Sequence, residues 1–480
     1  MQPVRLPKHW LTMGLSPRLT GRATARAHHS PVASAFLRRI EPFFAGREVT
    51  GGPLLLATIL ALVLTNSPWA RVYEGFWNTP VKVAFGAWQV SHPLAEWIDH
   101  ALLPLFFVIV GADVKREMVV GPLGRWRTAA FPLAGAVGGM VVPVALFLLV
   151  AGGTPAEMGW GSVITTDTAF GLALIALFAT SLPVGLRALM LAFAAVDDVG
   201  GLLVIALAYS DSIDPVGLAV AAGGLAGIIG LRRIGWVSSV PYVLLGTIIW
   251  GGVLESGVHA TIAGVLIGLT VPVKPRLGQH DFAHRVQRRV DAFRDAHDAA
   301  EQADQGEHQE ELRERAEEGL GYLHEMAAAT REASSRLIEL LTPWVNYIVL
   351  PLFALSNVRI HVSADLLAMI GSPVVLGVVL GLVVGKPLGF ISFTWAASAL
   401  GLAQRPDQVS WPMVAGVGML AGIGFTISLF IAGLAFGGGP LREAASLGVV
   451  IASVLAAGFG YATLRFCVEP QHAAEAPTGG

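Results

Sequence analysis

The chain has 480 residues, of which 54% are hydrophobic and only 14% are charged, with a net charge of −2. Soluble domains usually have about 25% charged residues, so this composition excludes a wholly water-exposed surface. Apolar runs of roughly 20 residues, long enough to cross a bilayer as helices, recur along the sequence, whereas transmembrane strands would give shorter, alternating segments. The single cysteine excludes an intramolecular disulfide framework and a multi-cysteine metal site. The sequence therefore predicts an all-α polytopic membrane protein, and nothing in it indicates a nucleic-acid partner.

Residues 1–50 form a basic segment that contains proline. It lacks an apolar core followed by a small-residue cleavage site, so it does not resemble a signal peptide. A basic cytoplasmic tail is the simplest interpretation, and an Arg-rich transit peptide stays open as an alternative. The basic residues are Arg5, Lys8, Arg18, Arg22, Arg26, Arg38, Arg39 and Arg47.

Hydropathy predicts about twelve spans, whose boundaries are uncertain by several residues. An even number places both termini on one side of the membrane. The segment 368–399 is long, and one tilted helix would explain its length. The predicted spans are 51–67, 94–114, 128–151, 158–180, 186–209, 214–231, 237–254, 256–272, 337–357, 368–399, 411–436 and 441–464.

Positive charge alternates between the predicted loops. The loops "SDSIDP" and "GGVLESG" contain no Lys or Arg, whereas the loops on the other side are basic. By the positive-inside rule this pattern places the basic loops, and with them both termini, in the cytoplasm. The basic loop residues are Lys115, Arg116, Arg125, Arg127, Arg187, Arg232, Arg233 and Arg405.

Two loops are unusual. "NTPVKVAFGAWQVSHP" alternates apolar and polar residues around a glycine, which predicts a short β-hairpin outside the membrane. Residues 273–336 are hydrophilic, and their i,i+4 opposite charges favour a helical cytoplasmic insert. The predicted organisation is a tail (1–50), eight spans (51–272), the insert (273–336), four spans (337–465) and a cytoplasmic C-terminal tail (466–480).

Ionisable residues interrupt three predicted spans. Asp197 and Asp198 lie in the fifth span, the run from Thr165 to Thr168 interrupts the fourth, and Lys386 lies between Gly385 and Pro387 in the tenth. A charged group at bilayer depth costs about 2.5–3.5 kcal/mol on insertion scales, so such residues normally mark an ion pathway. The four consecutive polar residues "TTDT" predict a broken helix, because they can bond their own backbone.

The lysine and the aspartates predict a charge-balanced cluster. Adjacent residues on a helix point about 100° apart, so Asp197 and Asp198 should have different partners. Lys386 can pair with one of them, either as a purely structural ion pair or as part of a transport site. Surplus carboxylates beyond that pair require a mobile cation or proton.

The eleventh span repeats the broken-helix theme with Gly416, Gly418, Gly422 and Gly424. Glycine at these positions can reflect close helix packing alone, but two interrupted helices that cross at the midplane fit inverted-repeat transporters.

His259 near a span end is either a pH switch or a satisfied polar group. Asp113, Arg116 and Glu117 end the second span, where interfacial anchoring is an equally good interpretation.

Together these motifs resemble the NhaA family of Na+/H+ antiporters, itself a standard example of inverted repeats. The resemblance runs from about residue 40 to 465. The segments that carry it are "FFVIVGADVKREMVVGPL", "TTDTAFGLALIALF", "AVDDVGGLLVIAL", "SGVHATIAGVLIGLTVP", "LPLFALSN", "GKPLG" and "LAGIGFTISLFIAGLAFG".

The resemblance implies an electrogenic, pH-regulated antiporter of Na+ or Li+ against H+, in which Asp198 carries the cation and proton. Asp197 would assist in binding the transported Na+ and form a salt bridge with Lys386, while Thr166 and Asp167 would lie at the helix crossing. Asp99 would belong to the cation funnel. It also implies a homodimer that contacts through the hairpin, and residence in the inner membrane of a bacterium. The residues that match the cytoplasmic pH-response region are His259, Asp113, Arg116 and Glu117.

The sequence departs from the family pattern in its long insert and in Arg336 and Glu339, which do not align cleanly with the family's basic and acidic residues before the ninth span. Three other functions make different demands on the sequence. A Na+-coupled solute symporter would need a cavity for an organic substrate, and a channel would lack a compact occluding cluster. An intramembrane aspartyl protease needs acids on two helices, whereas "AVDDVGG" puts both on one. We expect a transporter rather than an enzyme, without a cofactor and surrounded by lipid.

Overall fold

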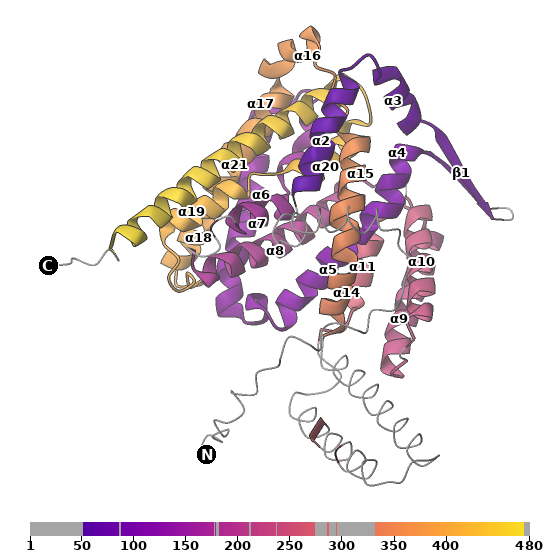
Figure 1. Cartoon of the computed structure of the whole chain (residues 1–480), viewed down its shortest axis with the longest axis horizontal. Coiled ribbons are helices and arrows are strands. Elements are labelled where there is room, and N and C mark those ends of the chain that lie inside the picture. Colours follow the sequence, from indigo (N-terminus) through magenta and orange to yellow (C-terminus); the bar gives the residue numbers. More distant parts are fainter. Residues whose placement is uncertain are drawn as a thin grey trace, which may run out of the picture. The chain divides into compact units, whose positions relative to one another are not determined.

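The computed structural model describes residues 51–474, except 86–87, 177, 179–181, 211–212 and 237; between 274 and 331 it describes only 286, 287 and 294. The predicted basic tail and nearly all of the predicted insert therefore lie outside the described residues. The described residues belong to one unit, Thr50–Gly480. They are mostly helical, and their sheet is the single pair β1–β2 (Figure 1). The all-α prediction is confirmed.

Helices of very different lengths alternate with short connections. The α-helices are α2 (Gly52–Thr65), α3 (Ala70–Trp77), α4 (Leu94–Trp97), α5 (Leu103–Val119), α6 (Trp126–Ala151), α7 (Thr168–Ala176), α8 (Val184–Ala208), α9 (Pro215–Arg233), α10 (Val240–Glu255), α11 (Thr261–Thr270), α14 (Ala333–Trp344), α15 (Leu350–Asn357), α16 (Ala364–Ala368), α17 (Pro373–Val379), α18 (Lys386–Ala399), α19 (Trp411–Leu420), α20 (Phe425–Phe436) and α21 (Pro440–Ala474). The 3₁₀ and π turns are η2 (Ile98–Leu102), η3 (Pro122–Gly124), η4 (Glu157–Val163), η5 (Val345–Val349), η6 (Met369–Gly371) and η7 (Leu380–Gly385).

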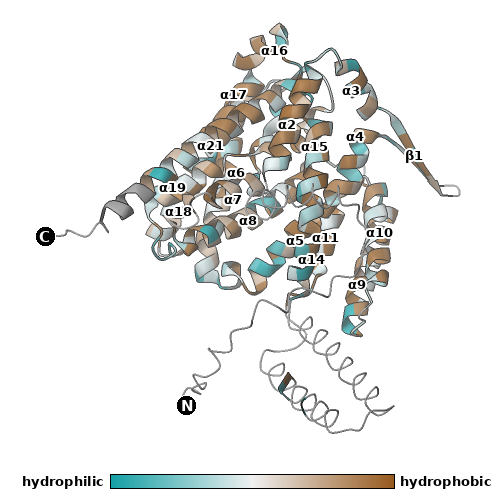
Figure 2. Ribbon diagram, in the orientation of Figure 1, coloured by the Kyte–Doolittle hydropathy of each residue, from teal (hydrophilic) through white to brown (hydrophobic). Residues whose placement is uncertain are grey.

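Seven of the described helical segments are long and apolar enough to cross a membrane. Two bent pairs, α2 with α3 and α19 with α20, pass the same test together, and α10 and α11 are shorter apolar helices. Hydrophobic residues predominate along these helices (Figure 2). Multiple spans are thus present, and the total of twelve stays a prediction.

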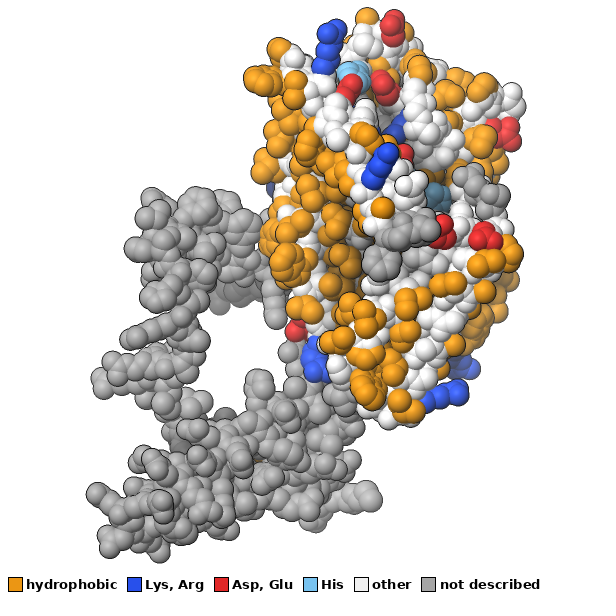
Figure 3. All heavy atoms as spheres, turned by 90° about the vertical axis from the view of Figure 1, so that its right-hand side faces the viewer, with side chains coloured by type: hydrophobic (Ala, Val, Ile, Leu, Met, Phe, Trp, Pro, Cys, Tyr) orange, Lys and Arg blue, Asp and Glu red, His pale blue; other side chains and the backbone are white. Residues whose placement is uncertain are grey.

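The connections gather on two sides. The hairpin side carries β1 (Pro80–Phe85), β2 (Trp88–Pro93) and the connections 256–260 and 358–363. The insert side carries the connections 120–125 and 400–410 and both ends of the insert, where Ser334 N donates to Pro272 O over 3.1 Å. The basic loop residues predicted to face the cytoplasm lie on the insert side. On the face shown in Figure 3, hydrophobic side chains are densest on the left flank and in the lower half, whereas charged side chains lie mainly in the upper half and at the lower end.

The predicted hairpin is confirmed. β1 and β2 pair antiparallel with Pro80 opposite Pro93 and Phe85 opposite Trp88. Trp97 Nε1 donates to Val81 O over 3.0 Å, so the helix that follows the hairpin is fastened to its first strand. Sequence alternation therefore predicted the strand pairing; the turn at 86–87 lies outside the described residues.

Three π turns occur inside long spans, and each precedes a proline. η2, η5 and η7 end one residue before the dipeptides Leu103–Pro104, Leu350–Pro351 and Lys386–Pro387. Proline has no N–H and its ring clashes with the carbonyl four residues earlier, so widening the preceding turn keeps the span continuous. Two of these turns position charged residues, since η2 contains Asp99 and η7 leads directly into Lys386.

Glycines bring α6 and α18 into backbone contact. A Cβ placed on Gly389 would lie 2.0 Å from Gly138 O, and one on Gly138 would lie 2.1 Å from Gly389 O. Small residues at such crossings allow close van der Waals packing of transmembrane helices. This contact holds the span that carries Lys386 against α6.

Two boundaries differ from prediction. The single helix predicted over 368–399 is present as one continuous span, Pro373–Ala399, which begins five residues later because α16 and η6 end at an extended Ser372. The last span is predicted to end at residue 464, whereas α21 continues as helix to Ala474; the cytoplasmic C-terminal tail from residue 466 stays a prediction.

Candidate ion-binding site

Two helices are interrupted, and their interruptions touch. Residues 164–167 separate η4 from α7, and residues 421–424 separate α19 from α20, which are bent by 45°. Thr166 Oγ1 donates to Ala421 O over 2.8 Å, and Asp167 N donates to Ile423 O. The η4–α7 segment runs from the hairpin side toward the insert side and α19–α20 runs the other way, as inverted repeats require.

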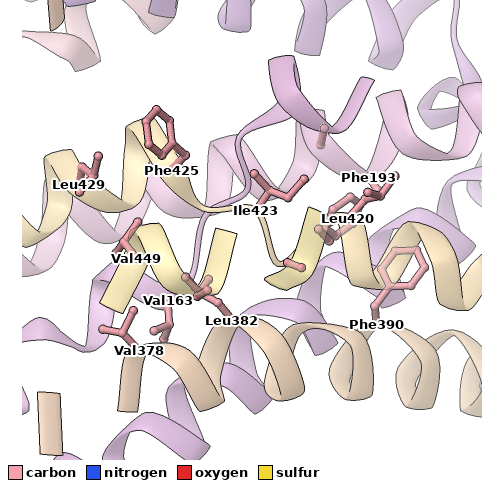
Figure 4. Close-up of a cluster of buried hydrophobic side chains, with 14 of the residues drawn as sticks. Val163, Phe193, Val378, Leu382, Phe390, Leu420, Ile423, Phe425, Leu429 and Val449 are labelled. Atoms are coloured by element: carbon pink, nitrogen blue, oxygen red, sulfur yellow. The ribbon is translucent and has the colours of Figure 1, made fainter. Parts of the chain in front are cut away.

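Apolar side chains enclose this crossing. Figure 4 shows Leu382, Leu420 and Ile423 beside it, with Phe193 and Phe390 at one end. All five are buried, and the rings of Phe193 and Phe390 meet edge to face with centroids 4.9 Å apart. A dry surrounding strengthens every electrostatic interaction at the crossing.

Asp167 binds the amino ends of both half-helices. Its Oδ2 accepts from Thr426 N over 3.1 Å and from Thr426 Oγ1 over 2.6 Å, while its Oδ1 accepts from Phe170 N over 3.3 Å. Each helix amino end carries roughly half a positive charge, so α7 and α20 together offset about one carboxylate. The charge of Asp167 is thus balanced by backbone.

Lys386 and Asp197 form a buried ion pair. The ammonium nitrogen lies 2.8 Å from both carboxylate oxygens of Asp197, and it also donates to Thr166 Oγ1 over 3.1 Å. Both charged side chains are completely buried. The predicted pairing of Lys386 with one aspartate is therefore present, and the lysine is linked through Thr166 to the end of α19.

Asp198 has much weaker contacts than its neighbour. Thr168 Oγ1 donates to its Oδ2 over a long 3.3 Å, and its Oδ1 is buried with no hydrogen-bond partner among the described residues. Because Asp198 is one residue after Asp197 on α8, it faces the start of α7 rather than Lys386. The sequence expectation of different partners for the two aspartates is met.

The hydroxyl groups of Thr165 and Ser428 are also buried without a hydrogen-bond partner in the described structure. Thr165 packs against α8, because a Cβ on Gly201 would lie 2.1 Å from its Cγ2. Ser428 lies on the first turn of α20, beside Gly424. Unsatisfied buried oxygens are costly, so this crossing contains oxygen atoms that lack fixed donors.

The formal charges of this cluster do not cancel. Three buried carboxylates, Asp167, Asp197 and Asp198, share one ammonium, that of Lys386. The half-helix ends offset Asp167, and Lys386 offsets Asp197, which leaves Asp198 without a fixed positive partner. An isolated buried carboxylate is highly unfavourable, so Asp198 requires a proton or a cation.

Asp99 lies in a separate polar network on the hairpin side. Its Oδ1 accepts from Asn357 Nδ2 over 2.9 Å, and Arg442 donates to Asn357 Oδ1 over 3.1 Å. Arg442 also donates to Gly437 O, after the end of α20. The network therefore joins η2, α15 and the connection between α20 and α21.

The residues predicted for pH response divide into two groups. Asp113, Arg116 and Glu117 lie together near the end of α5 on the insert side, where Arg116 Nε is 3.6 Å from Glu332 Oε2. His259 lies on the hairpin side instead, with its Nε2 2.9 Å from Tyr209 O. The structure therefore does not bring His259 together with the other three residues, and a role in the pH response stays a prediction for all four. α11, which starts after His259 and runs parallel to α5, has 10 residues and so separates the two groups by about 15 Å.

Several contacting residues were not predicted. Thr426 and Ser428 lie in "GFTISLF", and their polarity within an apolar span was an available signal. Asn357 and Arg442 were not singled out, because each lies at a helix end where a polar residue is ordinary. Tyr209 was also missed; its hydroxyl accepts from Gly161 N over 3.0 Å and donates to Met158 O over 2.7 Å, which ties η4 to α8.

Sequence comparison assigns this arrangement to a family. The profile of the family described as Na+/H+ antiporter 1 matches residues 41–464. This chain belongs to the NhaA family of Na+/H+ antiporters. The match spans every helix that contributes to the crossing.

Relatives from other bacteria are similar over nearly the whole chain. The Na+/H+ antiporter NhaA 2 of Sorangium cellulosum is 40% identical over 440 residues, which are 91% of each chain. The Na+/H+ antiporter NhaA of Koribacter versatilis is 38% identical over 428 residues, 88% of this chain and 91% of the relative. Among solved structures, the sodium proton antiporter MjNhaP1 of Methanocaldococcus jannaschii covers 92% of this chain with 12% identity and a TM-score of 0.41.

Proposed function

We propose that this protein exchanges Na+ or Li+ for protons, and that Asp198 alternately binds the cation and the proton. The observation that carries the proposal is the buried carboxylate of Asp198, which has one long hydrogen bond and no fixed counter-charge. A cation and a proton would compete for this one group. The family and the names of the bacterial relatives support the same activity.

The neighbouring groups have distinct roles in this proposal. Asp197 approaches the cation when its pair with Lys386 opens, and it then shares the site with Asp198. Thr168, together with the hydroxyls of Thr165 and Ser428, offers the oxygen ligands that hard cations prefer. Asp167 and Thr166 hold the two interrupted helices together at the crossing. The half-helices can then change orientation while the carboxylate of Asp167 keeps neutralising the positive amino ends of α7 and α20.

The rest of the pathway is also a proposal. Asp99 attracts cations on the hairpin side, and Asp113, Arg116 and Glu117 adjust activity to pH on the insert side, with His259 as a second titrating group near Tyr209. Two carboxylates that serve one cation favour more protons moving in than Na+ moving out, which would make the exchange electrogenic. The protein would lie in a bacterial inner membrane as a homodimer joined through its hairpins, with the tail, the insert and the C-terminus in the cytoplasm.

The symporter alternative needs an organic-substrate cavity at the charged cluster. A cavity of about 1060 Å³ lies elsewhere, between α5, α9, α10, α11 and α14, and its lining includes Arg232, Tyr242 and Leu337 but none of the charged residues at the crossing. A binding site for an ion alone therefore fits the cluster better.

Acid-loaded inverted vesicles test the proposal. Adding Na+ outside should raise the internal pH in vesicles with the wild-type protein and leave it unchanged with Asp198→Asn. Asp214→Asn is the matched control, because Asp214 only caps α9 by accepting from Val216 N and Gly217 N, and it should exchange normally. Normal exchange by Asp198→Asn would refute the proposal, and no proton movement by the wild type between pH 6.5 and 9 would favour sodium-coupled solute uptake.

A further inference from the structure

A second group of cation ligands lies on the hairpin side, away from the helix crossing. His92 is in β2, Glu96 is in α4 and His100 is in η2. One ligand atom from each lies within 4.8 Å of the other two. Among the residues that the structure describes, this is the one group of three or more His, Cys, Asp or Glu side chains with such spacing.

The backbone holds the three residues in place from both ends. His92 is paired with Val81 in the hairpin, and Pro93 then turns the chain into α4. At the other end, the carbonyl of His100 accepts a hydrogen bond from Trp250 Nε1 over 2.5 Å. Because the strand register and the contact with α10 fix both ends, few degrees of freedom would be lost when a ligand binds.

The donor set selects the kind of ion. Two imidazole nitrogens and one carboxylate oxygen are a known zinc set that leaves a fourth position for water. Imidazole favours zinc, copper and nickel, whereas calcium, magnesium and sodium prefer oxygen alone. We propose that His92, Glu96 and His100 form a binding site for a divalent transition-metal ion of the zinc class.

The present distances suit this proposal after movements of roughly 0.5–1.5 Å, because ligand atoms up to 4.8 Å apart must come to about 3.3 Å from one another. His92 Nδ1 lies 2.8 Å from Glu96 Oε2 and shares a hydrogen with it. Two ligands of a tetrahedral zinc ion with bonds of about 2.0 Å lie roughly 3.3 Å apart. Glu96 therefore has to withdraw by only about half an ångström, and the metal takes the place of the shared proton. The imidazole rings of His92 and His100 are already close, with centroids 5.2 Å apart.

A bound dication would also act on the neighbouring cation pathway. His100 follows Asp99 in the same π turn, and Asp99 accepts from Asn357. Two positive charges beside Asp99 would repel Na+ on the hairpin side and hold η2 rigid. This inhibitory consequence rests on the proposed exchange function, whereas metal binding itself does not.

The chain offers a control of matched composition on the same side. His361 also lies near two glutamates, with Nε2 2.5 Å from Glu74 Oε1 and Nδ1 3.6 Å from Glu443 Oε1. The two carboxylates approach different nitrogens of the ring, so the three residues cannot bind one ion together. His361→Ala therefore removes a histidine from a similar environment without removing a chelate.

Zinc binding to the purified full-length protein tests the site. The protein would be dialysed against Zn²⁺ and the bound metal counted by atomic emission. Because the chain has 13 histidines, zinc can also bind elsewhere, so the readout is the difference in bound zinc between variants. His92→Ala/His100→Ala should bind one zinc fewer than wild type, and His361→Ala should bind the same number. Equal zinc in the wild type and the double variant would overturn the proposal.

A variant that preserves shape guards against misfolding. Glu96→Gln keeps both histidines and the volume of the side chain. It should weaken the affinity of this site for its one zinc ion by at least about tenfold, since a charged ligand is lost. An unchanged affinity would contradict the assignment of Glu96. In vesicles, Zn²⁺ added on the hairpin side should slow exchange by the wild type more than by Glu96→Gln. If zinc binds as proposed but no variant exchanges Na+ for protons, the proposed function fails and the metal site stands.

Discussion

Replacing Lys386 by alanine removes the positive partner from a completely buried ion pair. Its ammonium contacts both oxygens of Asp197 at 2.8 Å and the hydroxyl of Thr166 at 3.1 Å. Breaking a buried pair by removing one partner typically costs about 3–5 kcal/mol, because the other charge stays buried without compensation. We therefore expect Lys386→Ala to lower stability more than it lowers the affinity for Na+.

The magnitude can be expressed as a change in melting temperature. Unfolding entropy is about 2.1 cal/mol/K per residue, which is roughly 0.76 kcal/mol/K for the roughly 360 residues that the structure describes. A loss of 3–5 kcal/mol then corresponds to a Tm lower by roughly 4–7 °C. Thermal unfolding in detergent, followed by tryptophan fluorescence, is the assay. Lowering the pH should reduce the difference, because protonation neutralises the remaining Asp197.

Two further variants separate charge from volume. Lys386→Met keeps most of the buried volume but removes the charge, so it should lose nearly as much stability as Lys386→Ala. Adding Asp197→Asn to either variant should restore part of the loss, since the unpaired carboxylate is then gone. An unchanged Tm in Lys386→Ala together with abolished Na+ binding would refute the reasoning and assign Lys386 a direct role in binding.

Three other substitutions test the scaffold around the site. Gly389→Val should prevent folding, because its Cβ would lie 2.0 Å from Gly138 O, and this would be measured as a loss of monodisperse protein. Gly223→Ala is the control and should fold normally, because a Cβ there meets nothing within 4 Å. Thr426→Val should lower stability by about 1.5–3 kcal/mol through the lost hydrogen bond to a charged group, whereas Thr426→Ser should retain it, as chemical denaturation would measure. Tyr209→Phe should cost about 1–3 kcal/mol through two lost hydrogen bonds and should slow exchange in vesicles by loosening η4.

The charged cluster was predictable because its members are chemically out of place. Asp197, Asp198 and Lys386 stand in apolar segments, and a charge at that depth needs a partner. The polar run at Thr165–Thr168 likewise predicted the break in its helix. What the sequence could not supply was the assignment of partners, since the choice between Asp197 and Asp198 for Lys386 depends on how α8 is rotated against α18.

Hydropathy does not register every feature of the fold. Segment 368–399 is one span, as predicted, but it starts at Pro373, because the extended Ser372 lies unnoticed between apolar residues. The resemblance groups His259 with Asp113, whereas its own loop lies on the hairpin side, as the scarcity of basic residues before the eighth span already indicated. The π turns that position Asp99 and Lys386 were not foreseen, yet Pro104 and Pro387 mark them in the sequence.

Proton release on Na+ binding tests the central claim most directly. Na+ would be added to the purified protein in weakly buffered detergent solution near neutral pH, with choline as the control cation, and the acidification of the medium recorded. If Na+ and protons compete for Asp198, the wild type should release about one proton or more per Na+ bound, and Asp198→Asn should release none. Na+ binding by the wild type without proton release, or equal release by Asp198→Asn, would contradict the account.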